Sequence, residues 1–349
     1  MRLAVILFNL GGPDAPEAVE PFLRNLFTDA AIIALPAALR LPLGWLIAKR
    51  RAPVAQKIYG NIGGRSPIFE ETRAQADGLE KLLNGDGVET KVFVAMRYWH
   101  PFSDRAARAV KAFGPDRIVL LPLYPQYSTT TTASSLKDWA RAAKRAGLTG
   151  PSSRVCCYPW EPGFVAAIAA QIHDGMAGAP ENISYRLLLS AHGLPKRMVQ
   201  KGDPYQWQVE QSAAAIVKAL AMPRLEPVVC YQSRVGPLEW TGPSTDAEIM
   251  RAGRDGKGVI VAPIAFVCEH SETLVELDIE YRRLAGEYGV PDYRRARTAG
   301  THPDFVAGLA GLVARALDGK TVTCGDGRIC PVNHKRCGYG APRADARNK

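Results

Sequence analysis

The segment CEHSETLVELDIEYRR carries several acidic side chains at a spacing that could do chemistry. Written on a helix, four of them fall at positions i, i+3, i+7 and i+11 of one face: Glu269, Glu272, Glu276 and Glu280. Like charges at this spacing repel and cost helix stability, so the fold alone gives no reason to stack them. A solvated charged face is the common alternative, but the apolar run GVIVAPIAFV just before it predicts a buried strand. We therefore favour a functional row of carboxylates beside His270.

A histidine that can work with this row ends another predicted strand. In LLLSAHGLP, His192 is followed by glycine and proline, which favour a tight loop. A lone histidine is as often a structural residue as a functional one, but a strand end is where functional side chains gather. An imidazole opposite Glu272 can accept a proton or bind a divalent metal, and this pair suits iron or zinc better than calcium. Glu276 and Glu280 would then form a hydrophilic path for cation delivery or proton exit.

The elements that must position these residues are strands alternating with helices. Eight short runs rich in Val, Ile and Leu alternate with longer helical patterns, such as 71–83 and 205–220, which is typical of parallel sheets covered by helices. The predicted strands are 2–10, 90–98, 116–124, 154–159, 185–193, 226–233, 258–266 and 290–297. The two halves echo each other, since IVLLPLYPQYSTTTTASSL and VIVAPIAFVCEHSETLVEL share one pattern.

This repeat predicts an α/β fold of two similar Rossmann-like lobes, each a four-stranded parallel sheet flanked by helices, with a cleft between them. We expect an N-terminal lobe with an apolar lip at 1–155, a C-terminal lobe at 156–317, and a cysteine-bearing tail at 318–349. Ligands of open α/β sheets bind beyond the carboxyl ends of the strands. That rule places these residues in the cleft: Asn9, Leu10, Arg97, Tyr98, His100, Tyr124, Tyr127, Ser128, His192, Gln232, Ser233, Arg234, Glu269, His270 and Glu272.

Aromatic side chains at this mouth could sandwich a large flat ligand, with Arg97 pairing its carboxylates, although each is as readily explained by core packing. The glycine-bearing stretches NLGGPD and NIGGRSP lack the GxGxxG and Walker patterns, so we expect no nucleotide. The hydroxyl-rich run from Ser128 to Ser135 is better explained as a capped helix start than as an anion site.

Composition narrows the class of protein and its partners. The chain has 349 residues, 47% hydrophobic and 22% charged, as in soluble globular proteins, with a formal net charge of +10. The basic residues do not form blocks with interleaved aromatics, which argues against nucleic acid and for an anionic small molecule or membrane surface. No secretory signal is evident, so we expect a cytoplasmic protein.

The most apolar stretch, 31–51, is interrupted by Pro36, Arg40 and Pro42 and ends in basic residues, so it does not predict a transmembrane helix. Two interpretations stay open: an amphipathic lip at the inner face of a membrane, or part of the core.

Seven blocks, in order, carry a resemblance to the ferrochelatase family: FNLGGPDAPEAVEPFLRNLFTD, IGGRSPI, MRYWHP, LPLYPQYSTTTTASS, SAHGLP, YQSRVGPLEWTGPSTD and CEHSETLVELDIEY. The resemblance covers residues 2 to about 317 and implies insertion of ferrous iron into a porphyrin. It implies that His192 and Glu272 are the catalytic, metal-binding and proton-abstracting pair, and that Glu276 and Glu280 form an acidic metal conduit. The implied porphyrin-binding positions are Leu10 (where some relatives have Met), Arg97, Tyr98, Tyr127, Ser128 and Trp240.

The expected reaction is protohaem formation from protoporphyrin IX, the final step of haem biosynthesis. The alternatives are a coproporphyrin III ferrochelatase, a sister chelatase for cobalt or nickel, and a two-lobed haem- or iron-binding protein without chemistry. The expected partners are porphyrin and ferrous iron, with an anionic membrane and a second copy of the chain as further candidates.

The seven cysteines form an odd set without an export signal, which argues against a disulfide framework. Three of them, Cys324, Cys330 and Cys337, lie in a polar tail that cannot build a core, and a structural metal centre would tie that tail down. Part of the ferrochelatase family carries a 2Fe–2S cluster with three tail ligands and one internal ligand. Cys156 and Cys157 are the candidates for the fourth ligand here, and zinc or three reduced thiols are the alternatives.

Overall fold

The computed structural model describes residues 1–85, 87–234 and 238–340, and the chain divides into two compact units. The first unit contains residues 1–157, 310–329 and 338 onward, and the second contains 158–309 and 330–337. The sequence-based division instead ends the first lobe at 155 and treats 318–349 as a separate tail. The last segments of the chain are thus shared between the two units.

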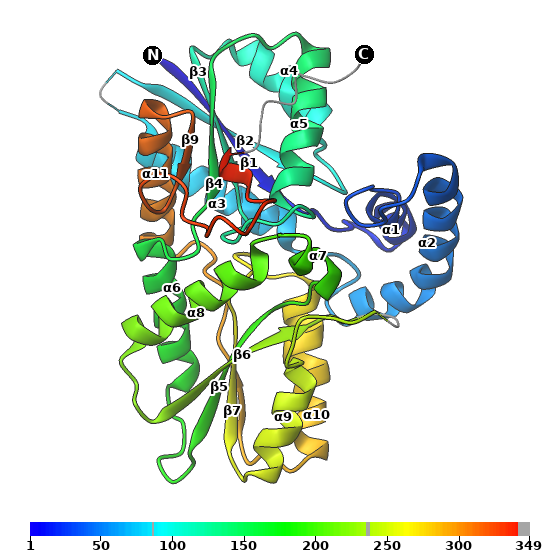
Figure 1. The fold of residues 1–349 in the computed structure, drawn as a ribbon, viewed down its shortest axis with the longest axis vertical. Coiled ribbons are helices and arrows are strands. Elements are labelled where there is room, and N and C mark those ends of the chain that lie inside the picture. Colours follow the sequence, from blue (N-terminus) through cyan, green and yellow to red (C-terminus); the bar gives the residue numbers. More distant parts are fainter. Residues whose placement is uncertain (86, 235–237, 341–349) are drawn as a thin grey trace. The chain divides into compact units, whose positions relative to one another are not determined.

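The first unit is built on a five-stranded parallel sheet of order β2-β1-β3-β4-β9 (Figure 1). Its strands are β1 (Arg2–Asn9), β2 (Glu89–Met96), β3 (Arg117–Pro122), β4 (Ser152–Cys157) and β9 (Thr321–Thr323). Its helices are α1 (Val19–Phe27), α2 (Ala37–Gly60), α3 (Ile68–Leu83), α4 (Ser103–Phe113) and α5 (Thr132–Ala146), with short 3-10 turns at Pro16–Ala18 and Gly338–Gly340. Strand β1 is an almost continuous buried apolar run, as expected of a strand covered on both faces.

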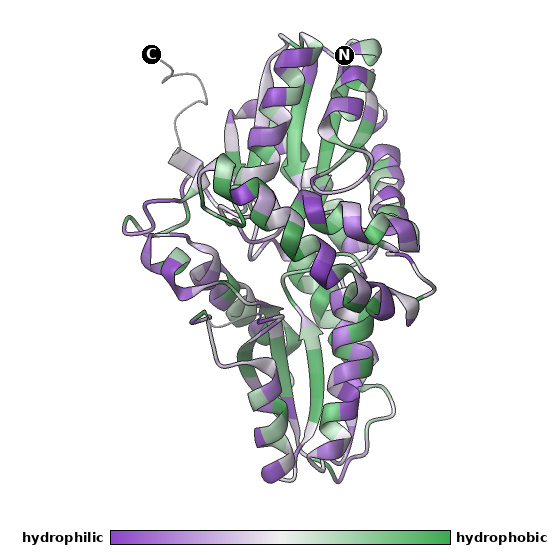
Figure 2. Ribbon diagram, turned by 90° about the vertical axis from the view of Figure 1, so that its right-hand side faces the viewer, coloured by the Kyte–Doolittle hydropathy of each residue, from purple (hydrophilic) through white to green (hydrophobic). Residues whose placement is uncertain are grey.

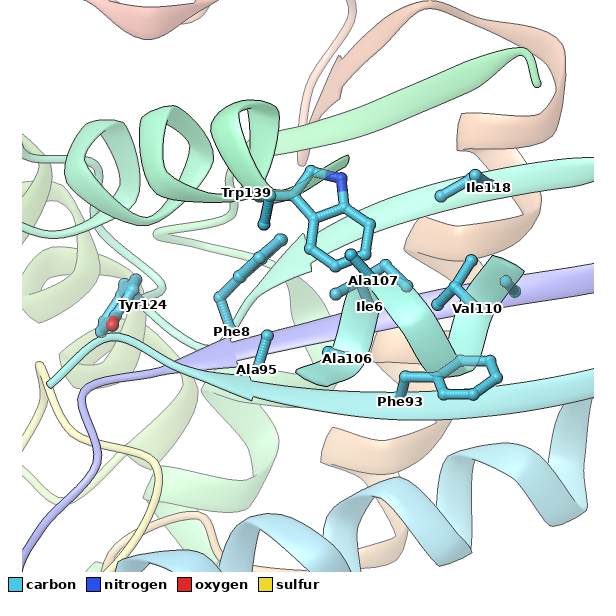
Figure 3. Close-up of a cluster of buried hydrophobic side chains, with 12 residues drawn as sticks. Ile6, Phe8, Phe93, Ala95, Ala106, Ala107, Val110, Ile118, Tyr124 and Trp139 are labelled. Carbon is cyan, nitrogen blue, oxygen red and sulfur yellow. The ribbon is translucent and has the colours of Figure 1, made fainter. Parts of the chain in front are cut away.

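Apolar side chains from β1, β2 and β3 pack against α4 and α5 to form the core of this unit (Figure 3). Phe8 of β1 meets Trp139 of α5 edge to face, with ring centroids 5.9 Å apart, a geometry that contributes about 0.5–1.5 kcal/mol beyond burial. Helix α4 faces the sheet with the small residues Ala106 and Ala107, with Val110, and at its end with Phe113, whose ring centroid lies 5.8 Å from that of Phe93. This core fixes the carboxyl ends of β1, β2 and β3, which carry Asn9, Arg97 and Tyr124.

The second unit is built on a four-stranded parallel sheet of order β6-β5-β7-β8. Its strands are β5 (Tyr185–His192), β6 (Leu225–Gln232), β7 (Gly258–Pro263) and β8 (Tyr293–Arg295). Its helices are α6 (Pro162–Met176), α7 (Lys196–Gln200), α8 (Tyr205–Leu220), α9 (Thr245–Arg254), a π-helix (Glu272–Glu280) and α10 (Tyr281–Glu287), and α11 (Pro303–Asp318) spans the passage back to the first unit. In both sheets the strands are hydrophobic and the outer helix faces hydrophilic (Figure 2).

The predicted α/β class with two helix-flanked parallel sheets is confirmed, and all eight predicted strands are present. The strand count of the first sheet is corrected, because the tail adds β9 at its edge. Arg154 pairs with Thr321 and Val155 with Val322 in parallel register. A three-residue strand with two threonines gives no apolar run, so periodicity could not reveal it.

Helix α2 explains why the apolar stretch 31–51 fitted two interpretations. Its small residues Gly44, Ala48 and Ala52 are buried toward α1, which lies beside it (dark blue in Figure 1). Six of its large apolar side chains are at least 38% exposed: Leu39, Leu41, Leu43, Trp45, Leu46 and Val54. The helix is therefore held in the unit by its small residues and by the buried Tyr59, and it exposes most of its large apolar side chains. No helix among the described residues is long and apolar enough to cross a membrane.

Candidate active site

His192 and Glu272 meet at the carboxyl end of the second sheet. His192 is the last residue of β5 and stands in register with Gln232, the last residue of β6. Its Nδ1 lies 2.9 Å from Glu272 Oε2, while its backbone carbonyl accepts a hydrogen bond of 3.1 Å from Tyr205. The two side chains are 40% and 31% exposed, so the pair is both fixed and open to a ligand.

The electrostatics of this pair favour the charged form of each partner. Burial opposes ionisation of Glu272, but the neighbouring imidazoles of His192 and His270 hold the pKa of Glu272 well below its usual range. Burial likewise favours a neutral His192 ring, yet the Glu272 carboxylate, with help from Glu276, raises the pKa of His192. A carboxylate that stabilises the imidazolium makes the imidazole a better proton acceptor.

Glu276 follows Glu272 by four residues along the same helix, and several donors hydrogen-bond to its carboxylate. Its carboxylate accepts from the Ser233 backbone N–H (2.8 Å), the Ser233 hydroxyl, Gln232 Nε2 (3.1 Å) and the Tyr281 hydroxyl (3.1 Å). Burial and the charge of Glu272 nevertheless raise the pKa of Glu276. Ser233 has φ +58, a left-handed conformation unusual for a non-glycine residue, and such strain persists where surrounding contacts enforce it.

The acidic row differs from the sequence-based one in two ways. Residues Glu272–Glu280 form a π-helix, a rare geometry that is frequent at functional sites. Glu269 precedes this helix and does not belong to the row: its carboxylate accepts from Arg295 Nη1 (3.0 Å) and the Thr298 backbone N–H (3.0 Å). The expectation of four aligned carboxylates is therefore wrong for Glu269. Glu272, Glu276 and Glu280 all lie on this π-helix, and Glu280 is exposed.

In the first unit, Arg97 and Tyr98 follow β2 and share one carboxylate. Arg97 Nη2 and the Tyr98 hydroxyl each donate to Asp29 Oδ2 over 2.8 Å, and Arg97 Nε donates to Ser134 over 2.8 Å. Tyr98 is fully buried against α1 and α2, whereas the Arg97 side chain is 20% exposed. Tyr98 thus supports the backbone of this loop, and Arg97 is the one of the two that a ligand can reach.

The other porphyrin-binding candidates occupy different surroundings. Leu10 is half-buried beside the α1–α2 cluster. Tyr127 packs against Cys156 and Cys157, and Ser128 is buried at the start of α5, where its carbonyl accepts from Ala133. Trp240 belongs to the second unit, where it bridges to Pro195 and approaches Gly193. That approach brings the indole close to the loop directly after His192.

The cysteine candidates are divided between the units. Cys156 and Cys157 are buried at the end of β4, and Cys324 N donates to Cys157 O over 3.2 Å. Cys330 and Cys337 belong to the second unit and are 5% and 6% exposed, and Cys330 Sγ accepts from Gln208 Nε2 over 3.0 Å. Within the described ranges, no group of three or more His, Cys, Asp or Glu side chains is arranged to hold a metal.

Sequence reasoning missed two residues that shape these sites. Asp29 holds Arg97, and Tyr281 donates to Glu276. Both end blocks that carry the family resemblance, but neither lies at a strand end, and the blocks alone assigned them no role. Gln232 and Ser233, in contrast, follow from the strand-end rule.

Comparisons with known proteins identify the family to which the chain belongs. The ferrochelatase family model matches residues 2–317. The ferrochelatase of Phenylobacterium zucineum is 55% identical over 341 residues, covering 97% of this chain and 98% of the relative, and that of Caulobacter vibrioides is 53% identical over 343 residues, covering 96% and 97%. Among solved structures, SirB from Bacillus subtilis with Fe3+ resembles the fold with a TM-score of 0.55 at 15% identity, covering 90% of this chain and 96% of SirB. The chain therefore belongs to the ferrochelatase family of porphyrin metal chelatases.

Proposed function

We propose that this ferrochelatase inserts ferrous iron into protoporphyrin IX and releases protohaem, as the final step of haem biosynthesis. The observation that carries the proposal is the His192–Glu272 contact of 2.9 Å at a half-open sheet edge. The exposed apolar face of α2 favours protoporphyrin IX, which has two propionates, over coproporphyrin III, which has four.

In the proposed reaction, His192 accepts one pyrrole proton at a time and Glu272 stabilises the imidazolium that results. The first proton would leave to solvent along Glu276 and Glu280 before His192 accepts the second. Metal insertion must also remove water from the iron and expose a nitrogen lone pair of the macrocycle. Remote contacts to the porphyrin, from Leu10, Arg97, Tyr127, Ser128 and Trp240, would offset the cost of bending it. Tyr98, which is fully buried, would act through the loop that carries Arg97. Glu276 and Glu280 would bind the cation on its way to His192 and Glu272. The hydrogen bonds to Glu276 would keep its carboxylate in a fixed position along this path.

An anaerobic insertion assay with ferrous iron and each porphyrin tests this function. We expect protoporphyrin IX to be preferred by at least about tenfold in kcat/KM, which is about 1.4 kcal/mol of transition-state stabilisation. A preference for coproporphyrin III would show that this porphyrin, and not protoporphyrin IX, is the substrate. Absence of turnover with both, together with haem bound on purification, would favour the non-catalytic binding protein.

We propose that α2 contacts anionic lipid at the inner face of the cytoplasmic membrane. The exposed leucines and Trp45 would enter the interface, and Lys49, Arg50 and Arg51 would add about 1 kcal/mol each near an anionic surface. We expect the protein to float with anionic liposomes at low salt and to be released at high salt.

The variant Leu39→Glu, Leu41→Glu should abolish this flotation. Leu82→Glu is the matched control, because Leu82 is 56% exposed on α3 and should not contact lipid. Flotation that is absent at low salt, or that both variants keep, would contradict the proposal. Sedimentation of the lipid-free protein tests whether two copies of the chain form a homodimer.

We also propose that Cys324, Cys330 and Cys337 bind a 2Fe–2S cluster with Cys156 or Cys157. Thiolates are the ligands that such clusters prefer. The backbone contact between Cys324 and Cys157, and the burial of Cys330 and Cys337 within a polar tail, support the proposal. A bound cluster would supply a structural crosslink for the tail.

Anaerobically purified protein should be red-brown. Each tail Cys→Ser variant should lose the visible absorption and unfold at a lower temperature than wild type. Only one of Cys156→Ser and Cys157→Ser should have this effect, because neighbouring strand residues point to opposite faces. Cys230→Ser is the control: this buried thiol in β6 contacts Thr245 and should leave the colour intact. Stoichiometric zinc would keep the site and change its metal, whereas a metal-free, stable protein would refute the site.

A further inference from the structure

Asp29, in the first unit, accepts hydrogen bonds through both oxygens of its carboxylate, and the proposed reaction does not involve it directly. Its Oδ2 accepts three hydrogen bonds, from Arg97 Nη2 (2.8 Å), the Tyr98 hydroxyl (2.8 Å) and Ser134 Oγ (2.6 Å). The side chain is only 9% exposed. Burial disfavours its charge, yet the hydrogen bonds and Arg97 hold the pKa of Asp29 below its ordinary value. Asp29 is thus a buried anion whose two carboxylate oxygens both accept hydrogen bonds.

The same residue also folds the turn that leads into α2. Its Oδ1 accepts from the Ala31 backbone N–H (2.9 Å), and its carbonyl accepts from the backbone N–H groups of Ile32 and Ile33. Arg40 of α2 closes the turn from the other side by donating to the carbonyls of Thr28 (2.9 Å) and Leu35. One side chain therefore links the start of the apolar lip to the loop that carries Arg97.

Arg97 needs such a partner because of its electrostatic surroundings. It lines a cavity of about 560 Å³ together with Arg105, Arg108 and Arg141. Arg141 is engaged by Asp104 (2.7 Å) and Asp138 (2.8 Å). The Tyr98 ring, whose centroid lies 4.9 Å from the Arg97 guanidinium carbon, and the Ser134 hydroxyl also hold this side chain, and a fixed anion adds a charged partner. Asp29 is that anion for Arg97.

We infer that Asp29 is a positioning residue for porphyrin binding. It sets the direction of the Arg97 guanidinium and also the conformation of the turn that leads into α2. This inference rests on the proposed porphyrin contact of Arg97. Asp29 does not touch the substrate; it keeps Arg97 in the rotamer that meets a porphyrin carboxylate. Porphyrin affinity and the order of residues 31–33 should consequently change together.

The test is Asp29→Asn, which keeps the shape, removes the charge and, in either orientation of the amide, places an NH2 group against at least one donor. We expect the KM for porphyrin to rise about tenfold with kcat changed less than about threefold, since uniform binding is lost. The dissociation constant from iron-free fluorescence titration should rise equally, and amide exchange at 31–33 should accelerate. Adding Asp29→Asn to Arg97→Gln should weaken porphyrin binding no further.

Asp104→Asn is the matched control, because Asp104 lines the same cavity but binds Arg141 in an exposed ion pair; its KM and exchange should match wild type. Ser134→Ala, which removes one donor to Asp29 and one acceptor of Arg97, should raise the KM about threefold, and it decides the matter if Asp29→Asn does not fold. A wild-type KM in the folded variant overturns the inference. Wild-type protein that binds neither porphyrin overturns the proposed function instead.

Discussion

Replacing His192 with alanine should abolish iron insertion while porphyrin binding stays measurable. The imidazole is the proton acceptor nearest the reacting centre in the proposed reaction, and general-base catalysis contributes about 10²–10⁴-fold to a rate. Its removal leaves the aromatic and apolar contacts to the macrocycle in place. The measurement is single-turnover insertion of ferrous iron, paired with iron-free fluorescence titration of the porphyrin.

His302→Ala is the control for this experiment. His302 is a half-buried histidine of the second unit, near Asp304 at the start of α11, and its loss should change turnover less than about twofold. Near-normal turnover of His192→Ala would remove His192 from the catalytic pair, whatever the porphyrin affinity.

Glu272→Gln should be almost inactive, whereas Glu280→Gln should only be slowed. Glu272 contacts His192 and stabilises its charged form, so the amide, whose oxygen can still accept from Nδ1–H, loses the charge that stabilises the imidazolium. We expect a loss of about 10²-fold or more at Glu272 and about two- to fivefold at the exposed Glu280. The measurement is kcat/KM for iron at saturating porphyrin.

Glu287→Gln serves as the control, because Glu287 lies on α10 directly after the π-helix and pairs with Arg283 at the surface. Its activity should equal that of wild type. Equal losses at Glu272 and Glu280 would argue against a graded path, and a further loss at Glu287 would point to a general effect of surface charge.

The sequence predicted most of the fold because the buried strands are long apolar runs. Strands β1, β5 and β7 lie where those runs lie, and the strand-end rule placed His192, Gln232 and Ser233 at one edge. The spacing of Glu272 and Glu276 also placed both beside that edge. Where tertiary packing keeps the structure that the local hydrophobic pattern favours, the pattern alone is enough to predict the strand.

The features that could not be predicted depend on partners distant in sequence or on hydrogen bonding within a helix. Glu269 does not belong to the predicted acidic row because its carboxylate pairs with Arg295, which is 26 residues away in the sequence. The π-helix has the composition of an α-helix, and only its backbone hydrogen bonds distinguish it. Asp29 lies 68 residues from Arg97, and a single aspartate at a helix end has many ordinary explanations.

Strand β9 has a consequence for the solubility of the protein that does not depend on any metal. It hydrogen-bonds to β4, which ends in the buried run Val155, Cys156 and Cys157. A chain that stopped before Thr321 would present this apolar strand as an open edge, and open edges pair with other chains and seed aggregation. A few polar residues near the end of the chain thus cap the sheet, and they protect each molecule from its neighbours during folding.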